Sequence, residues 1–210
     1  FEIPEDMKAQ VLEYRSALLE KVAEATDELM SKYLETNTLS VEEIKTAIRM
    51  MVLKDEIYPV MCGTALQNIG VQLVLDNVVA YLPTPLDMPV IQALDPDDET
   101  KTIEVKASDT DPFVGLAFKV ATDPFVGRLT FFRVYSGNIK AGSYVLNSTN
   151  GNKERIGRIV RLHANTREDV DQVFAGEIAA AIGLKNTTTG DTLCDESRPV
   201  LLARPTFPEP

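Results

Sequence analysis

The sequence predicts an α+β multidomain protein, with a mainly helical N-terminal part followed by an antiparallel β-barrel. Three observations predict it. Apolar residues recur every three or four positions through the first 82 residues. Prolines then cluster at positions 83, 85 and 89, and proline cannot continue a helix. Beyond them, short β-prone runs alternate with turn residues. We therefore expect domains over residues 1–86 and 87–204, with 205–210 as a linker to a following domain.

Two helices are expected first. Residues 5 to about 35 have the apolar spacing of one long amphipathic helix, and Pro4 suits its beginning. A second helix should begin at Ser40, which has with Glu43 the spacing of a capping box, and should run to about Lys54. Both helices should pack through their apolar faces.

A strand, a loop and a third helix are expected next, in the manner of an α/β domain. Residues 57–62 are a short apolar run that predicts the strand, and residues 71 to about 82 predict the helix. Small residues in the loop between them would let backbone amides approach a ring or a phosphate. The same loop is also typical of a plain connection.

The second domain is expected to be a barrel of short strands. Glycine-containing turns separate the runs, and a closed antiparallel barrel leaves no sheet edge exposed. The expected strands lie at residues 103–107, 114–121, 127–135, 143–146, 155–162, 178–183 and 200–203, and the turns contain Gly137, Gly142, Gly151, Gly176 and Gly190.

Charge is distributed unevenly along the chain. The net charge is −11, yet the basic segment, residues 128–167, holds eight cations and one acid, Glu154. A basic segment in an acidic protein is a candidate phosphate-binding surface, although surface cations are often merely solvated. The cations proposed to contact RNA are Arg128, Arg133, Lys140, Lys153, Arg155, Arg158 and Arg161.

Strand periodicity sorts these cations between faces. Alternation in residues 130–135 places Phe131, Arg133 and Tyr135 on one face and the other three residues on the opposite face. Arginine beside aromatic rings can bind single-stranded RNA, while the alternative is that the rings fill the barrel. Cations at positions 155, 158 and 161 cannot share a face of a regular strand, unless Gly157 forms a bulge.

No catalytic or metal-binding residues are predicted. His163 is the one histidine, and neither a nucleophile elbow nor a phosphate-binding P-loop motif is present. Cys62 and Cys194 lie too far apart in sequence to indicate a zinc site, which favours a reducing, cytoplasmic location. The acidic run 95–99 is typical of a solvated turn. No run is apolar enough to span a membrane.

Taken together, these runs resemble bacterial elongation factor G. The second domain of that family is similar to residues 122–137, 140–145, 154–159, 176–183 and 189–193. The insert of its GTPase domain is similar to residues 20–24 and 28–35, and the last strand and helix of that domain to residues 59–65, 68–72 and 81–83.

The resemblance implies a fragment of a factor that hydrolyses GTP and moves transfer and messenger RNA on the ribosome. The barrel would contact small-subunit ribosomal RNA, the GTPase core and following domains of the same chain, with no membrane or DNA partner. Gly63, Thr64 and Ala65 would match the last guanine-recognition loop. We expect no cofactor here, because the parts that hold GTP and Mg²⁺ in the parent factor are absent from these 210 residues. This chain should therefore not be an enzyme.

Three alternatives remain open. A related translational GTPase, such as a ribosomal-protection protein or a release-factor GTPase, would share the barrel. A stand-alone enzyme would have its site between the helical part and the barrel, with a pH-dependent activity that depends on His163. A purely structural interaction module would bind no ribosome.

Overall fold

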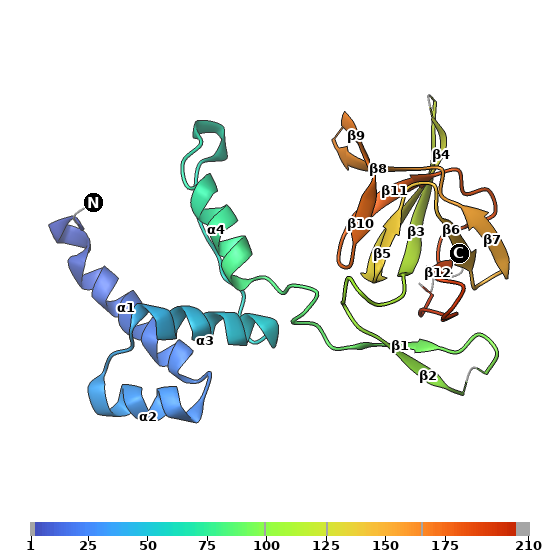
Figure 1. Ribbon diagram of the computed structural model, residues 1–210. Coiled ribbons are helices and arrows are strands. Elements are labelled where there is room, and N and C mark those ends of the chain that lie inside the picture. The colour runs from blue at the N-terminus through green and yellow to red at the C-terminus, as the bar shows by residue number, and fades with distance from the viewer. Residues whose placement is uncertain (1–2, 99, 125, 165, 205–210) are drawn as a thin grey trace, which may run out of the picture. The chain divides into compact units, whose positions relative to one another are not determined.

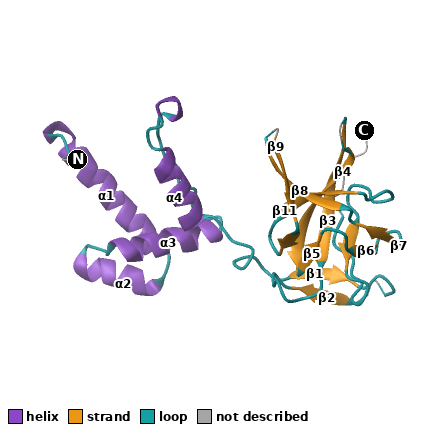
Figure 2. Ribbon diagram, turned by 45° about the horizontal axis from the view of Figure 1, so that its top comes forward, coloured by secondary structure: helices purple, strands orange, loops and turns teal. Residues whose placement is uncertain are grey.

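The computed structural model describes residues 3–204 except 99, 125 and 165. The chain divides into two units, Phe1–Pro83 and Thr84–Pro210 (Figure 1). In the described part, the first unit is helical and the second is built of strands, as Figure 2 shows. The predicted α+β class, with helices followed by an antiparallel barrel, is confirmed. The predicted linker over residues 205–210 lies outside the described residues.

The helical unit contains four α-helices among its described residues. After a 3₁₀ turn over Glu5–Met7 come α1 (Lys8–Ala23), α2 (Asp27–Thr36), α3 (Val41–Leu53), a second 3₁₀ turn over Ala65–Gln67, and α4 (Val71–Tyr81). A small core between α1, α2 and α3 contains Leu19, Val22, Ala23, Leu39, Ile44 and Ala47.

The prediction of one helix over residues 5–35 is wrong. The helix breaks at Thr26, which has extended backbone angles and caps α2 by accepting a hydrogen bond from the Leu29 amide at 3.2 Å. The break turns α2 back on α1, so that Leu29 and Tyr33 pack on the core around Val22. Burial of these side chains therefore outweighs the continuity of the helix.

The predictions for α3 and α4 are confirmed. The Ser40 amide donates to Glu43 Oε2 at 2.8 Å and the Glu43 amide donates to Ser40 Oγ at 3.3 Å, which is the predicted capping box. Arg49 of α3 donates to the Ala80 carbonyl at 2.9 Å, which ties α3 to the C-terminal end of α4.

The predicted strand over residues 57–62 is wrong, because these residues pair with no other described segment. An extended run becomes a strand only when a neighbour satisfies its backbone groups. Apolar side chains of this run and of α4 are correspondingly exposed, among them Tyr58, Val60, Leu73, Leu75 and Val79.

The second unit is antiparallel throughout its described strands. Eight strands form one sheet in the order β7-β6-β12-β3-β4-β11-β8-β9, and β10 pairs with β5 and β1 with β2. Their bounds are β1 Ile91–Leu94, β2 Thr102–Val105, β3 Val114–Asp123, β4 Gly127–Ser136, β5 Asn138–Lys140, β6 Tyr144–Asn147, β7 Asn152–Arg155, β8 Arg158–His163, β9 Thr166–Val170, β10 Gln172–Phe174, β11 Ile178–Ile182 and β12 Thr192–Cys194.

The sheet curls back on itself (Figure 1). The described residues of this unit form three apolar clusters, and the largest is the barrel core. The core residues come from most of the strands and include Phe113, Phe132, Val134, Val145, Ile156, Ile159, Val173 and Leu193. Two predicted runs differ from the structure. The run 155–162 is two strands, and the run 200–203 is not a strand, since Leu201 makes a single bridge with Leu94.

Gly157 is a connection and not the predicted bulge, because it lies between β7 and β8. Its amide donates to the Ile182 carbonyl at 2.9 Å. A Cβ atom at this position would lie 3.0 Å from the same oxygen, so the close approach favours glycine. The turn places Arg155 and Arg158 on separate strands.

Candidate nucleic-acid interface

The predicted alternation along β4 is confirmed. Thr130, Phe132 and Val134 are fully buried, while the alternate residues are half-buried on the other face. The Arg133 guanidinium lies 5.3 Å from the Tyr135 ring centroid. One cation of the basic segment is therefore held against an aromatic ring beside the sheet.

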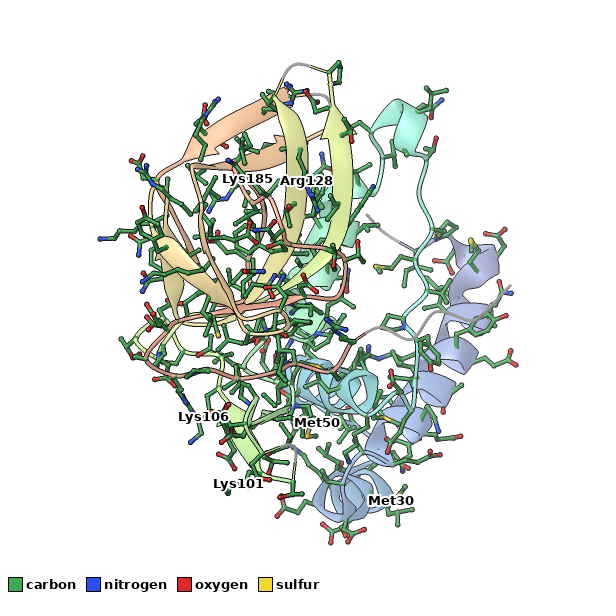
Figure 3. All side chains as sticks on the ribbon, turned by 90° about the vertical axis from the view of Figure 1, so that its right-hand side faces the viewer. Met30, Met50, Lys101, Lys106, Arg128 and Lys185 are labelled. Carbon is green, nitrogen blue, oxygen red and sulfur yellow. The ribbon has the colours of Figure 1, made fainter. Side chains whose placement is uncertain are left out.

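Arg128 is a structural tie. Its Nη1 donates to the Lys185 carbonyl at 2.8 Å and its Nη2 donates to the Thr187 carbonyl. Arg128 and Lys185 lie at the same end of the barrel (Figure 3). A shallow pocket of about 390 Å³ lies beside them, lined by Val126, Arg128, Ile182, Gly183, Leu184 and Lys185. Both carbonyls fix the guanidinium, so Arg128 positions the 185–187 loop.

Glu154, the one acid of the basic segment, holds the same loop through its amides. Its side chain is buried, and its Oε2 accepts hydrogen bonds from the amides of Lys185 at 2.5 Å and Asn186 at 2.8 Å. Its Oε1 accepts a hydrogen bond from the Thr187 hydroxyl at 2.6 Å. Strand alternation turns Glu154 inward, so the cations on either side of it in β7 face outward.

Cations of β8 and β9 are paired with acids at the surface. Arg158 Nε and Nη2 donate to the Asp169 carboxylate at 2.9 and 2.7 Å, and the arginine holds the pKa of Asp169 below its usual value.

Two further arginines of β8 and β9 pair with carboxylates that lie outside these two strands. Arg161 pairs with Glu177, and Arg167 pairs with Asp123. An exposed pair such as Arg158 with Asp169 contributes only about 0–1 kcal/mol. A phosphate could therefore replace the carboxylate at Arg158, but these pairs reduce the net charge of that surface.

The outward face of the β6–β7 hairpin carries cations around an exposed ring. Tyr144 is 62% exposed and lies directly opposite Arg155 in the strand register. Lys153 Nζ lies 5.7 Å from the Tyr144 ring centroid and 2.5 Å from a Glu196 carboxylate oxygen.

Arg155 faces the turn that precedes β6. Its Nε donates to the Gly142 carbonyl at 3.1 Å, and the same turn begins after the exposed Lys140. We call Lys140, Tyr144, Lys153 and Arg155 the hairpin surface.

The Gly63, Thr64 and Ala65 loop lies in the helical unit and is a closed turn. Thr64 and Ile69 exchange two backbone hydrogen bonds, at 3.0 and 3.1 Å. A Cβ atom on Gly63 would lie 2.7 Å from the Ile69 carbonyl oxygen. Ala65, within this turn, is exposed to solvent.

The remaining chemical features are sparse. His163 is exposed, and its Nε2 lies 3.6 Å from a Glu168 carboxylate oxygen. Among the described residues, no group of three or more His, Cys, Asp or Glu side chains is arranged to hold a metal ion. No helix in the described ranges is long and apolar enough to cross a membrane.

Sequence reasoning did not single out Tyr144 and Lys185. The signal for Tyr144 was its place in the expected strand 143–146, where it alternates with the core residue Val145. Lys185 had no local signal, because its loop is fixed by the distant Arg128 and Glu154.

Two comparisons with known proteins bear on the barrel. Residues 127–194, from β4 to β12, match the family model of Elongation factor Tu domain 2. A crystal structure of a protein from Thermus thermophilus is similar over 99% of this chain, with a TM-score of 0.72 and 23% sequence identity. This chain spans 29% of the length of that protein. The structural likeness shows the fold, and the family match shows that the barrel is similar to a translation-factor domain.

Proposed function

We propose that this chain is part of a translational GTPase of the elongation factor G type, in which the barrel docks on small-subunit ribosomal RNA. The observation that carries the proposal is the match of residues 127–194 to Elongation factor Tu domain 2. The resemblance of residues 20–24 and 28–35 to the insert of the GTPase domain favours elongation factor G over related GTPases. The factor would work in the cytoplasm and promote movement of transfer and messenger RNA.

The hairpin surface is the part of the barrel best suited to dock on RNA. Lys140 and Arg155 are exposed and have no carboxylate partner among the described residues. Lys153 is exposed too, although Glu196 pairs with it, as other carboxylates pair with Arg158 and Arg161. Each Lys or Arg that neutralises a phosphate releases counterions, which makes binding weaken with salt. We assign a positioning role to Arg128 and a secondary contact to Arg133.

The helical unit would join the barrel to the GTPase core. Its exposed apolar residues on α4 and in residues 57–62 suit burial against a sheet of the same factor. The Gly63, Thr64 and Ala65 loop would approach the guanine base there. GTP and Mg²⁺ would be held by other parts of the factor, because catalysis of phosphoryl transfer needs a phosphate cradle and a metal site. This chain alone would not hydrolyse GTP.

The test is binding to purified small ribosomal subunits as a function of salt. We expect Lys140→Ala and Arg155→Ala each to reduce the slope of log affinity against log salt by about 0.7–0.9. Lys101→Ala is the control, since Lys101 is an exposed lysine of the same unit that lies between β1 and β2 and pairs with Asp98 at 2.9 Å. Wild-type chain that does not bind the subunits, or slopes unchanged by both substitutions, would refute the proposal.

A further inference from the structure

We propose that Tyr144 is a stacking platform for one unpaired base of the RNA, with Lys153 and Arg155 holding the neighbouring phosphates. This inference rests on the proposed function and adds that the RNA contacted by the hairpin surface is unpaired. The hairpin surface would recognise a single-stranded nucleotide in a loop or bulge, and not a continuous duplex.

The first argument is the exposure of the ring. Tyr144 is the first residue of β6, and the next residue, Val145, points into the barrel core. Tyr144 is consequently on the outer face, where 62% of it is exposed to solvent. Its partner across the hairpin is Arg155 and not an apolar residue. The ring therefore adds little to the core, and its large flat surface remains available to a ligand.

The second argument is the arrangement of charge around the ring. Lys153 Nζ lies over the Tyr144 ring at 5.7 Å from its centroid. Among the described residues, no second ring or cation stacks on Tyr144. One ring face is thus left for a base, and stacking on an aromatic side chain is tolerant of base identity because every base has a π face.

The Arg155 guanidinium has hydrogen-bond donors that no described residue uses. Its Nε donates to the Gly142 carbonyl at 3.1 Å, which fixes the plane of the group. Its two terminal nitrogens have no hydrogen-bond partner within the described residues. They can donate in parallel to two oxygens of a phosphate, the geometry in which arginine binds this group most strongly.

Glu196 is the competing acid at this site. Its carboxylate lies 2.5 Å from Lys153 Nζ and raises the pKa of that lysine. A phosphate that binds Lys153 must replace this carboxylate. Removal of the Glu196 charge should therefore strengthen RNA binding, a result that a purely structural role for the pair would not give.

The surroundings of Tyr144 favour RNA over a protein partner. Within the described strands β5, β6 and β7, no other large apolar side chain is exposed, and Leu146 is half-buried. A protein interface has an apolar core within its polar rim, which one tyrosine among cations does not supply. Duplex RNA keeps its bases stacked internally, so the ring can stack only on a base that is unpaired.

Tyr144→Trp provides a direct optical test, because the chain contains no tryptophan. We expect its fluorescence to be quenched by a single-stranded oligouridylate and to be unaffected by a blunt RNA duplex at equal phosphate concentration. Unchanged fluorescence with the single strand, or equal quenching by both RNAs, would overturn the inference.

Affinity for small ribosomal subunits separates this inference from the proposed function. We expect Tyr144→Ala to weaken binding by about 5- to 150-fold, the range for loss of one stacked base, and Tyr144→Phe to bind as the wild type does. We expect Glu196→Gln to bind several-fold more tightly, with Glu168→Gln as its control on β9. If Tyr144→Ala binds with wild-type affinity while Arg155→Ala still reduces the salt dependence of binding, the stacking role of Tyr144 is refuted and the proposed function is not. If the chain still binds ribosomal proteins from which the RNA has been removed, its partner is a protein, and the stacking proposal is refuted as well.

Discussion

Glu154, whose carboxylate is buried, should be a sensitive position in the barrel. Three donors of the 185–187 loop depend on it: the amides of Lys185 and Asn186 and the hydroxyl of Thr187, at 2.5, 2.8 and 2.6 Å. Glu154→Ala leaves all three without their acceptor, in a side-chain site that is only 6% exposed.

The size of the effect follows from these contacts. A hydrogen bond to a charged group contributes about 1.5–3 kcal/mol. The three bonds hold one loop and are not independent, and water can reach the loop once it loosens. We therefore expect Glu154→Ala to lower the free energy of unfolding by about 3–5 kcal/mol. Glu154→Gln keeps one acceptor oxygen and the volume of the side chain, so its cost should be about 1–2 kcal/mol.

Urea unfolding of the barrel, followed by circular dichroism, measures these differences. Amide hydrogen exchange at Lys185 and Asn186 reports the loop directly and should accelerate in both variants. Glu168→Ala, on the exposed strand β9, should stay within about 0.5 kcal/mol of the wild type. If Glu154→Ala unfolds within about 1 kcal/mol of the wild type and exchange of the two amides is unchanged, the carboxylate does not hold the loop.

Three further predictions concern the capping box, the turns and the nucleotide. The Lys32 ammonium and the Ser40 amide lower the pKa of Glu43 from 4.5 to about 2. The Glu43 carboxylate therefore stabilises the helix fully above pH 4.5, and this stabilisation is lost as the pH falls towards 2. The corresponding loss of ellipticity in acid should be missing in Glu43→Gln. Gly137→Ala should lower the melting temperature far more than Gly151→Ala. Both glycines have positive φ, but only at Gly137 would the new Cβ lie close to a carbonyl oxygen, that of Asp111 at 2.4 Å. Similar melting temperatures for the two variants would contradict this prediction. Fluorescent GDP should show no saturable micromolar binding to the chain, and tight binding would show that a complete nucleotide site is present.

Local signals made part of the fold predictable. The capping box of α3 involves residues three apart, and the glycine turns of the barrel depend on the conformation of single residues, so neither needs distant contacts. The break at Thr26 was missed because apolar periodicity continues across it. Its cap, followed by acids at positions 27 and 28, was a local signal that periodicity concealed.

Strands that depend on distant partners were less predictable. Residues 57–62 have a strand-like composition, but composition does not supply a neighbouring strand. Conversely, β5, β10 and β12 have three residues each, too few for a period-two pattern, and they form because partners elsewhere in the sheet are in register.

In the candidate site, too, local features could be predicted and distant contacts could not. Alternation predicted which face of β4 holds Arg133, because neighbouring positions decide it. The partners of the cations come from far along the chain: Arg128 binds carbonyls beyond β11, and Lys153 binds Glu196 beyond β12. Sequence alone could thus find the basic segment, but only the fold shows which of its cations are paired with carboxylates or carbonyls from other parts of the chain.

A photo-crosslinker in place of Tyr144 tests the docking of the barrel on RNA most directly. Tyr144→p-benzoylphenylalanine should crosslink to small-subunit ribosomal RNA on irradiation of the complex, at an unpaired nucleotide, whereas the same group at Lys101 should not. Crosslinks from position 144 to a ribosomal protein, or crosslinks to RNA from position 101 alone, would contradict the account.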